Sequence, residues 1–476
     1  MKLSKKIEEV FGADVRSLAA FRVGLALLIL VDLAKRFGDL KAHYTDLGLL
    51  PRAPFIEQFL NPLLFSIHLM SGLAWVQAVL FLLAAVFAVG LLIGYRTRWC
   101  TFFCWFMTCS LQARNPYILE GGDDVLRLLL FWSLFLPLGA WGSMDARGKE
   151  ESGKRFVSFG TAGIFIQIAL IYFFAGIHKT GAEWRDGSAV YQALSIDLYA
   201  GPLGVWLRDH HYGLTQFLTW SVYLYECFGP FLLFSPWFSG PVRTVAVFLF
   251  GMMQLGMGSC LQLEIFPWVN NVALISMLPS WFWDRLWNPV ILRKKPAAET
   301  ESVPAAGSSP WANLLAAFFL FFIVFWNIGN LQGSTLGVPA RLKGMSWTLG
   351  LYQNWHLFAP YPMKEDGWFV IPGKLRDGTE VDVFRKGAPI TWEKPLYVSQ
   401  TFKTNRWRKW MMTLALQPYA GLRLYYGRYL CREWNSSHPE PKQLETFEIV
   451  YMLERSLPYG QSPRAQKISI WKHHCF

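Results

Sequence analysis

Apolar runs long enough to cross a lipid bilayer recur along the first 330 residues, and they constrain the fold more than any other feature of the sequence. A helix needs about 20 apolar residues to cross roughly 30 Å of hydrocarbon. By this measure the pattern predicts roughly nine spans. They are expected at 17–33, 72–94, 99–111, 125–141, 158–177, 214–234, 242–263, 268–283 and 311–330. We therefore expect this part of the chain to be an all-α polytopic membrane domain.

The composition agrees with that expectation and narrows the classes of partner. Of the 476 residues, 53% are hydrophobic and only 16% are charged, whereas about 25% are charged in soluble domains. The net charge of +12 is compatible with nucleic-acid binding. No basic run is interleaved with a recognition motif, however, and the positive charges mostly fall between the spans. The expected partner is the lipid bilayer and not a nucleic acid.

Lysine and arginine concentrate in alternate loops, as they do on the cytoplasmic side of membrane proteins. The residues concerned are Lys2, Lys5, Lys6, Arg96, Arg98, Arg147, Lys149, Lys154, Arg155, Arg243, Arg293, Lys294 and Lys295. Lys35 and Arg36, at the outer end of the first span, are exceptions. The pattern predicts a cytoplasmic N-terminus and makes 114–124, 178–212 and everything after 330 extracytoplasmic. The polar first 17 residues do not resemble a cleavable signal peptide.

Four parts are expected along the chain. They are a transmembrane domain at 1–292, a linker at 293–310, a last transmembrane helix at 311–330, and an extracytoplasmic α+β domain at 331–476. In the last part, alternating residues around Asp377-Gly378 predict a β-hairpin, and 404–439 is rich in helix formers. Residues 188–213 predict an interfacial helix broken at Gly201-Pro202. Cys431 and Cys475 could pair in an oxidising space, although nothing in the sequence fixes their distance.

Lys179 lies where the apolar run ending in YFFAG gives way to a charged loop. A lysine in this position can extend its ammonium group into the headgroup layer and only anchor the helix end. Alternatively, an amine that is partly withdrawn from water becomes less stable as a cation, its pKa falls, and it can act as a base. The position alone leaves both interpretations open.

Several charged residues bracket the expected outer start of the fourth span, and Arg127 lies one turn inside it. Arg114 and Asp123 either balance one another or hold an acidic substrate group. An intramembrane arginine needs a partner, and Glu226 or Glu264 could provide one for Arg127.

The stretch YFFAGIHK, which ends at Lys179, resembles the segment of the vitamin K-dependent gamma-carboxylases that carries their catalytic lysine. In the family pattern Y-F-x-A-G-x-K-K-x-x-x-x-W, Lys179 falls on the second lysine, His178 on the first and Trp184 on the tryptophan. The stretches DVRSLAAFRVG, HYTDLGLLPR, RNPYILEGGDD and LEIFPWV are similar to signatures of the broader HTTM family, to which the carboxylases belong. QNWHLFAPYP, DGWFVIPG and RYLCREWN resemble the C-terminal region of bacterial members.

This resemblance implies an integral enzyme of the bacterial inner membrane with Lys179 as its catalytic base. Its co-substrates would be a reduced quinone (vitamin K or menaquinone hydroquinone), oxygen and, where carboxylation occurs, carbon dioxide. In that chemistry a neutral amine takes a proton from the quinol and an epoxide forms. The resulting strong base deprotonates a glutamate of a peptide or protein substrate, to which carbon dioxide adds. A dry, apolar pocket is required. The candidate substrate-binding residues are His178, Trp184, Arg114, Asn115, Asp123, Arg127, Glu226, Gln254 and Glu264.

Two positions depart from the carboxylase pattern. Gly122 stands about where the carboxylases place a functional histidine, and Gln254 stands where members commonly have histidine. Quinol epoxidation without carboxylation depends less on these two histidines, so it is the better supported half of the reaction.

Other chemistries find little support in the sequence. The adjacent pairs His210-His211 and His473-His474 cannot easily face one metal, and no third ligand follows at a recognisable spacing, so no metal site is expected. Nucleotide-binding and serine-hydrolase motifs are absent. The alternative function is a non-catalytic binding or maturation factor whose C-terminal domain recognises a protein or lipid.

Overall fold

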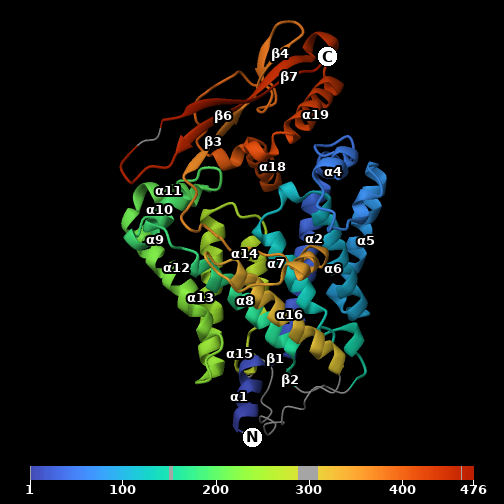
Figure 1. Cartoon of the computed structure of the whole chain (residues 1–476), viewed down its shortest axis with the longest axis vertical. Helices are drawn as coiled ribbons and strands as arrows, with labels where there is room; N and C mark the ends of the chain where they lie inside the picture. The colour runs from blue at the N-terminus through green and yellow to red at the C-terminus, as the bar shows by residue number, and fades with distance from the viewer. Residues whose placement is uncertain (1, 150–153, 288–308, 462–463) are drawn as a thin grey trace.

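The computed structural model describes residues 2–149, 154–287, 309–461 and 464–476. Figure 1 shows a layer of long helices above the N-terminus and, at the opposite end, a sheet-bearing part that we call the tail (residues 362–476). Before the tail, the helices are α1 (Lys2–Phe11), α2 (Val15–Phe37), α3 (Leu40–Tyr44), α4 (Arg52–Gln58), α5 (Ala74–Ile93), α6 (Thr97–Arg114), α7 (Gly121–Ser133), α8 (Phe159–Ile177), α9 (Ala182–Asp186), α10 (Ala189–Leu194), α11 (Pro202–His210), α12 (Tyr212–Leu232), α13 (Ser239–Cys260), α14 (Phe266–Ile275), α15 (Ser280–Trp287), α16 (Pro310–Gly329) and α17 (Ala340–Thr348). The short strands β1 (Ala13–Asp14) and β2 (Arg155–Phe156) pair antiparallel.

Five helices in the described part of the chain are long and apolar enough to cross a membrane: α2, α5, α8, α13 and α16. Their outer surfaces are apolar as well. Only 28% of the apolar window of α5 is buried, and Trp75 and Leu82 on this helix are 67% and 65% exposed. A surface of this kind is stable against lipid and not against water. The chain is therefore an integral, multi-pass membrane protein.

The other four expected spans also fold as helices, but with a different length or polarity. Span 99–111 lies in α6 and span 214–234 in α12, neither of which is among the five helices that are long and apolar enough to cross a membrane. Span 125–141 is the 13-residue α7 followed by turns. Span 268–283 is divided into α14 and α15, which are separated before Ser280 by Pro279. Proline cannot donate a helical hydrogen bond, and it disfavours helical geometry in the residue before it. The total of roughly nine spans stays a prediction.

Helix α8 is the most buried of the five, with 72% of its apolar window inside the protein. Glycine lets neighbouring helices approach it closely, as is common between membrane helices. A Cβ atom on Gly176 would lie 2.9 Å from the backbone nitrogen of Cys227 on α12. The last turn of α8 is consequently packed against α12 next to Glu226.

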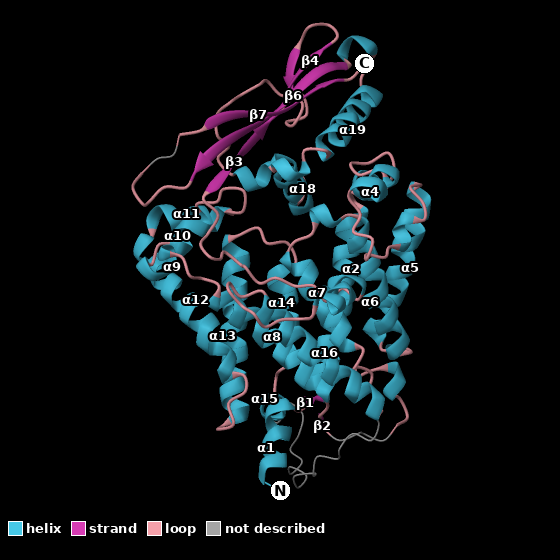
Figure 2. Cartoon of the chain, viewed as in Figure 1, coloured by secondary structure: helices cyan, strands magenta, loops and turns pink. Residues whose placement is uncertain are grey.

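The tail is an antiparallel sheet with two helices, as expected of an α+β unit. Its elements are β3 (Glu365–Val370), β4 (Pro372–Leu375), β5 (Glu380–Asp382), α18 (Asn405–Ala415), α19 (Leu422–Ser437), β6 (Leu444–Arg455) and β7 (Gln466–His474). The long strand β6 pairs with β3 and β4 along one side and with β7 along the other (Figure 2). The expected hairpin is found as β4 and β5, which are joined by a turn with Gly378 at φ +85°.

Cys431 of α19 and Cys475 after β7 form a disulfide, with their Cα atoms 5.4 Å apart. The bond ties the C-terminal end of the sheet to α19.

The interfacial segment breaks where expected, between α10 and α11 at Gly201-Pro202. The predicted linker at 293–310 lies outside the described residues except for its last two positions.

Candidate active site

Lys179 follows the C-terminal end of α8, and its side chain turns into the protein. The residue is 3% exposed. Its Nζ donates to the carbonyl oxygen of Ala175 at 3.2 Å, to that of Leu357 at 3.1 Å and to Oε2 of Glu226 at 2.5 Å. Three acceptors match the three N–H groups of an ammonium ion. This geometry differs from that of a lysine extended into the headgroup layer.

Glu226 is supplied by α12, 47 residues further along the chain. It is 4% exposed, so both members of the ion pair are buried. A buried charge is stable in a protein only when it is paired and hydrogen-bonded, and removing one member leaves the other uncompensated. The close approach of α8 and α12 at Gly176 brings the two side chains into contact.

Trp184 and His178, which follow and precede the lysine in the sequence, make different contacts. The indole ring of Trp184 has Lys179 Nζ 4.8 Å from its centroid, and its Nε1 donates to the carbonyl oxygen of Phe358 at 3.2 Å. The imidazole of His178 stacks on that of His356, with centroids 4.0 Å apart. Trp184 therefore contacts Lys179, whereas His178 faces the segment that precedes the tail.

A cavity of about 1070 Å³ opens beside Lys179. Of the residues predicted from sequence, Lys179, Trp184, Glu226 and Gln254 line it. Most of its wall is apolar, including Ile171, Leu249, Met252, Met253, Met257 and Phe266. Gln254 is 1% exposed; its Nε2 donates to the hydroxyl of Tyr172 at 3.3 Å, and its Oε1 has no partner in the described part of the chain.

Arg114 and Asn115 do not line this cavity, and the expected pairing of Arg114 with Asp123 is wrong. Arg114 is buried and donates through Nη2 to the carbonyl oxygen of Leu50 at 2.9 Å. Asn115 donates to the carbonyl oxygen of His43 at 3.2 Å. Arg114 is directed toward the loop that follows α3, whereas the Asp123 carboxylate pairs with other arginines, so the two charges do not meet.

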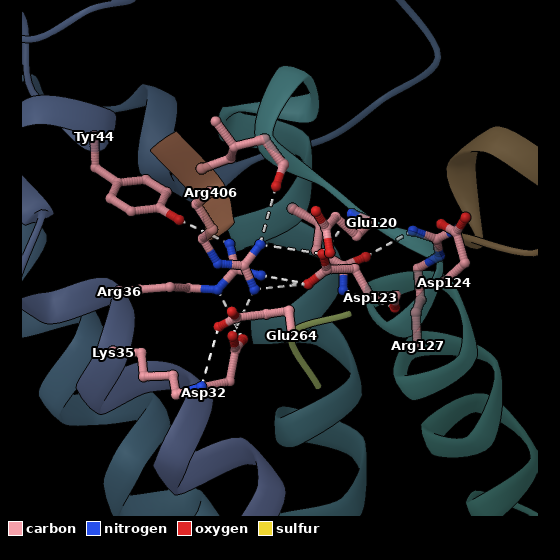
Figure 3. Close-up of polar contacts among 12 residues, drawn as sticks. Asp32, Lys35, Arg36, Tyr44, Glu120, Asp123, Asp124, Arg127, Glu264 and Arg406 are labelled. Carbon is pink, nitrogen blue, oxygen red and sulfur yellow. Dashed lines mark hydrogen bonds and ion pairs between the residues drawn. The ribbon is translucent and has the colours of Figure 1, made fainter. Parts of the chain in front are cut away.

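Asp123 instead belongs to a buried ion cluster that local sequence reasoning missed (Figure 3). Its carboxylate pairs with Arg36 of α2 at 2.5 Å and with Arg406 of α18 at 3.1 Å. Asp32 also pairs with both arginines, at 2.7 Å and 2.6 Å. The one available signal was Asp32 and Arg36, four residues apart inside an apolar run, where charges need partners. Two carboxylates and two guanidinium groups compensate one another here and join the tail to the helices.

Arg127 pairs with neither of the carboxylates expected for it. It pairs with Asp124 at 2.9 Å, and its Nε donates to the carbonyl oxygen of Gly350 at 2.7 Å. Glu264 pairs with Lys35 at 3.3 Å, at a place that does not line the cavity. Glu226 pairs with Lys179, and Arg127 contacts the backbone of Gly350, so the predicted partners face different neighbours.

A carboxylate of the tail caps the segment that forms one side of the cavity. Asp366 of β3 accepts hydrogen bonds from the backbone N–H groups of Asp197 and Leu198. The neighbouring Ile196 and Tyr199 line the cavity. Burial, together with the negative charge of Asp197, raises the pKa of Asp366 to about 7.

Within residues 2–149, 154–287, 309–461 and 464–476, no group of three or more His, Cys, Asp or Glu side chains could hold a metal ion. The residues around Lys179 that local sequence reasoning missed are His356 and Leu357. They lie far along the chain, and nothing near Lys179 in the sequence indicates them.

A family model described as the HTTM domain matches residues 12–283, more than half of the chain. No curated protein and no solved structure matches the chain. The matched region contains Lys179, Trp184, Glu226 and Gln254 but neither Leu357 nor any of the tail.

Proposed function

Because the chain belongs to the HTTM domain family, we propose that it is a carboxylase-like membrane enzyme that uses Lys179 as a base toward a reduced quinone, with dioxygen as co-substrate. The observation that carries this proposal is the position of Lys179 Nζ. The amine is withdrawn from solvent, paired with Glu226, and lines an apolar cavity of about 1070 Å³. Ligand cavities usually measure about 300–1,000 Å³, so this one can hold a quinone ring with part of its tail.

The lining of the cavity fits a lipid-soluble molecule that carries hydroxyl groups. Leu249 and Met252 of α13 line the cavity and are 49% and 64% exposed, which makes the α12–α13 side the entrance from the lipid. Gln254 Oε1 is buried without a partner in the described residues, and a ligand hydroxyl near it would satisfy this acceptor.

The Lys179–Glu226 pair provides a way to convert the ammonium group of Lys179 into a neutral amine, which can act as a base. When a proton passes from Nζ to Oε2 of Glu226, both groups become neutral, and low polarity around them favours neutral over charged forms. The free amine can then accept a proton from a hydroxyl in the cavity. The carbonyl oxygens of Ala175 and Leu357 and the ring of Trp184 stabilise the ammonium that forms. A bound reduced quinone would supply that proton and the electrons that dioxygen takes up.

Epoxidation is better supported than carboxylation. A Cβ atom on Gly122 would lie 2.8 Å from the backbone nitrogen of Phe266, so this position has no room for the histidine side chain that carboxylases place there. We assign carbon dioxide and a glutamate-containing peptide only to a second step, if the chain retains one.

The proposed orientation puts the N-terminus in the cytoplasm and the tail outside, in the periplasm of a bacterium. Two observations support it: the basic residues concentrate in alternate loops, and Cys431 and Cys475 are disulfide-bonded in the tail. Cysteine accessibility to a membrane-impermeant thiol reagent, tested on intact cells with a cysteine introduced at exposed Lys374, would check the side on which the tail lies.

The test of the proposed function is quinol epoxidation by the purified chain in detergent, followed by chromatography and mass spectrometry. Lys179→Ala and Lys179→Arg should both lose the activity, because arginine keeps the charge but does not give up its proton near neutral pH. Lys35→Ala is the matched control, a lysine at the end of a span whose side chain is 51% exposed, and it should retain the activity. Equal rates for the wild type and Lys179→Ala would overturn the proposal, and a folded wild type that forms no epoxide would favour the binding or maturation factor instead.

A further inference from the structure

The segment 350–361, which we call the strap, runs without helix or strand between α17 and the tail. In Figure 1 it is the orange loop that crosses the helical layer at the level of α7, α8 and α14. Non-helical backbone at membrane depth is tolerated only where protein or a cavity satisfies its polar groups. The partners of the strap therefore indicate what it is for.

Arg127 holds the first end of the strap. Its Nε donates to the carbonyl oxygen of Gly350 at 2.7 Å, and Nη2 donates to that of Tyr352 at 3.1 Å. The guanidinium carbon lies 4.0 Å from the centroid of the Tyr352 ring. Gly350 has φ +66°, and a Cβ atom there would lie 2.5 Å from Arg127 Cδ, so the strap passes directly against this side chain.

Gln353 holds the middle of the strap to two further helices. Its side chain accepts from Gln167 of α8 at 2.8 Å, and its carbonyl oxygen accepts from Trp326 of α16 at 2.8 Å and from Asn330 at 3.1 Å. Gln353 is 3% exposed and Gln167 is fully buried. Buried polar contacts of this kind fix a segment in one place, because breaking them leaves unpaired groups in an apolar environment.

The far end of the strap contacts the segment that carries the base. The carbonyl oxygen of Leu357 accepts from Lys179 Nζ at 3.1 Å, and that of Phe358 accepts from Trp184 Nε1 at 3.2 Å. The carbonyl oxygen of Pro360 accepts from the backbone nitrogen of Gly181 at 2.9 Å. Three carbonyl groups within four residues thus contact residues 179–184.

We propose that the strap positions the catalytic amine: the carbonyl group of Leu357 orients Lys179 Nζ toward Glu226, and Arg127 and Gln353 are positioning residues that hold this carbonyl in place. The inference rests on the proposed function, and it gives Arg127 a role in place of substrate binding. It also makes the site depend on residues beyond 283, where the match to the family ends.

The sharpest test weakens the Leu357 carbonyl alone. Replacing Phe358 by its α-hydroxy acid through nonsense suppression turns the preceding peptide bond into an ester, whose carbonyl is a poorer acceptor. The amide that is lost donates no hydrogen bond within the described residues. With the ammonium less well stabilised, the acid limb of the pH–rate profile should move down by roughly half a pH unit to one unit, and kcat should fall roughly tenfold.

A second readout needs no quinone. Only a neutral amine reacts with an uncharged acylating reagent, so mass spectrometry of the peptide that contains Lys179 measures its protonation against pH. The ester variant should shift this acylation curve to lower pH by the same amount as the rate profile. An unchanged curve together with an unchanged kcat would overturn the positioning role of Leu357.

Arg127→Lys should move the acylation curve in the same direction, because lysine cannot hold Gly350 and Tyr352 together. Arg243→Lys is the matched control: Arg243 is a fully buried arginine of α13 that contacts the backbone of α1, and its replacement should lower the yield of folded protein but leave the curve in place. An Arg127→Lys curve that matches the control would overturn the role of Arg127. If Lys179→Ala retained full epoxidation while the ester still shifted the curve, the proposed function would fail and the positioning would stand.

Discussion

Asp123 of α7 pairs with Arg36 of α2 at 2.5 Å and with Arg406 of the tail at 3.1 Å, so a single buried carboxylate connects the first span with the α+β part of the chain. The contact lies in a cluster in which Asp32 repeats the same two pairings (Figure 3). Through it, the tail is held to the helices by charges that are compensated only in the docked arrangement.

Removing Arg406 should release the tail. Arg406→Met leaves two buried carboxylates with one guanidinium group, and uncompensated buried charge destabilises by about 3–5 kcal/mol. Limited proteolysis of the tail in detergent, and the thermal midpoint, would measure the loss. Arg455→Ala is the control, because its pair with Glu365 is exposed on both sides and contributes about 1 kcal/mol or less. Equal protease resistance in the two variants would contradict this account of docking.

Glu226→Gln separates hydrogen bonding to Lys179 from acceptance of its proton. Glutamine can still accept a hydrogen bond from Lys179 Nζ but cannot take up its proton. We expect kcat for epoxidation to fall by roughly 10²-fold, the size of effect typical of general acid–base groups. Epoxide formation in a single turnover would measure it, with the yield of folded protein as a check on stability. A variant that is folded and as fast as the wild type would remove Glu226 from the proton path.

Asp366 should make the contact between β3 and residues 197–198 sensitive to pH. Its pKa of about 7 in the folded chain lies above the value of about 3.9 in an unfolded one. The folded state therefore binds more protons between about pH 4 and 7, and the stability of the contact falls as the pH rises through that window. Asp366→Asn cannot ionise and should abolish the slope. Thermal midpoints of both proteins at pH 5 and pH 8 would check this, and parallel changes would refute it.

The disulfide should stabilise the tail without taking part in catalysis. Cys431 and Cys475 are 44 residues apart, and closing a loop of that length stabilises a fold by about 2–4 kcal/mol. The double variant Cys431→Ser with Cys475→Ser should lower the midpoint of tail unfolding in urea, while epoxidation at low temperature stays unchanged. Loss of activity in a folded double variant would instead connect α19 with the cavity.

Sequence reasoning succeeded where the determining signal is local. Apolar runs identified α2, α5, α8, α13 and α16, because crossing a bilayer is a property of one segment. The turn at Asp377-Gly378 identified the hairpin of β4 and β5 for the same reason. Lys179 was singled out by its place at the end of an apolar run and by the residues beside it.

The partners of the charged residues could not be predicted in this way. Glu226 was one of two carboxylates expected as a possible partner of Arg127, but it pairs with Lys179. Arg127 meets a carbonyl oxygen 223 residues away, and Asp123 meets an arginine 283 residues away. Such pairings depend on the angles and registers of several helices at once, which no single stretch of sequence specifies.

The hydrogen bond from Lys179 to the carbonyl oxygen of Leu357 has a practical consequence for work on related chains. A fragment that ends where the shared domain ends would keep the lysine and its carboxylate yet lack the backbone oxygen that directs the amine, so its inactivity would say nothing about the chemistry of the intact molecule. Chimaeras between relatives should accordingly exchange residues 350–361 together with the membrane helices, and not with the tail that follows them.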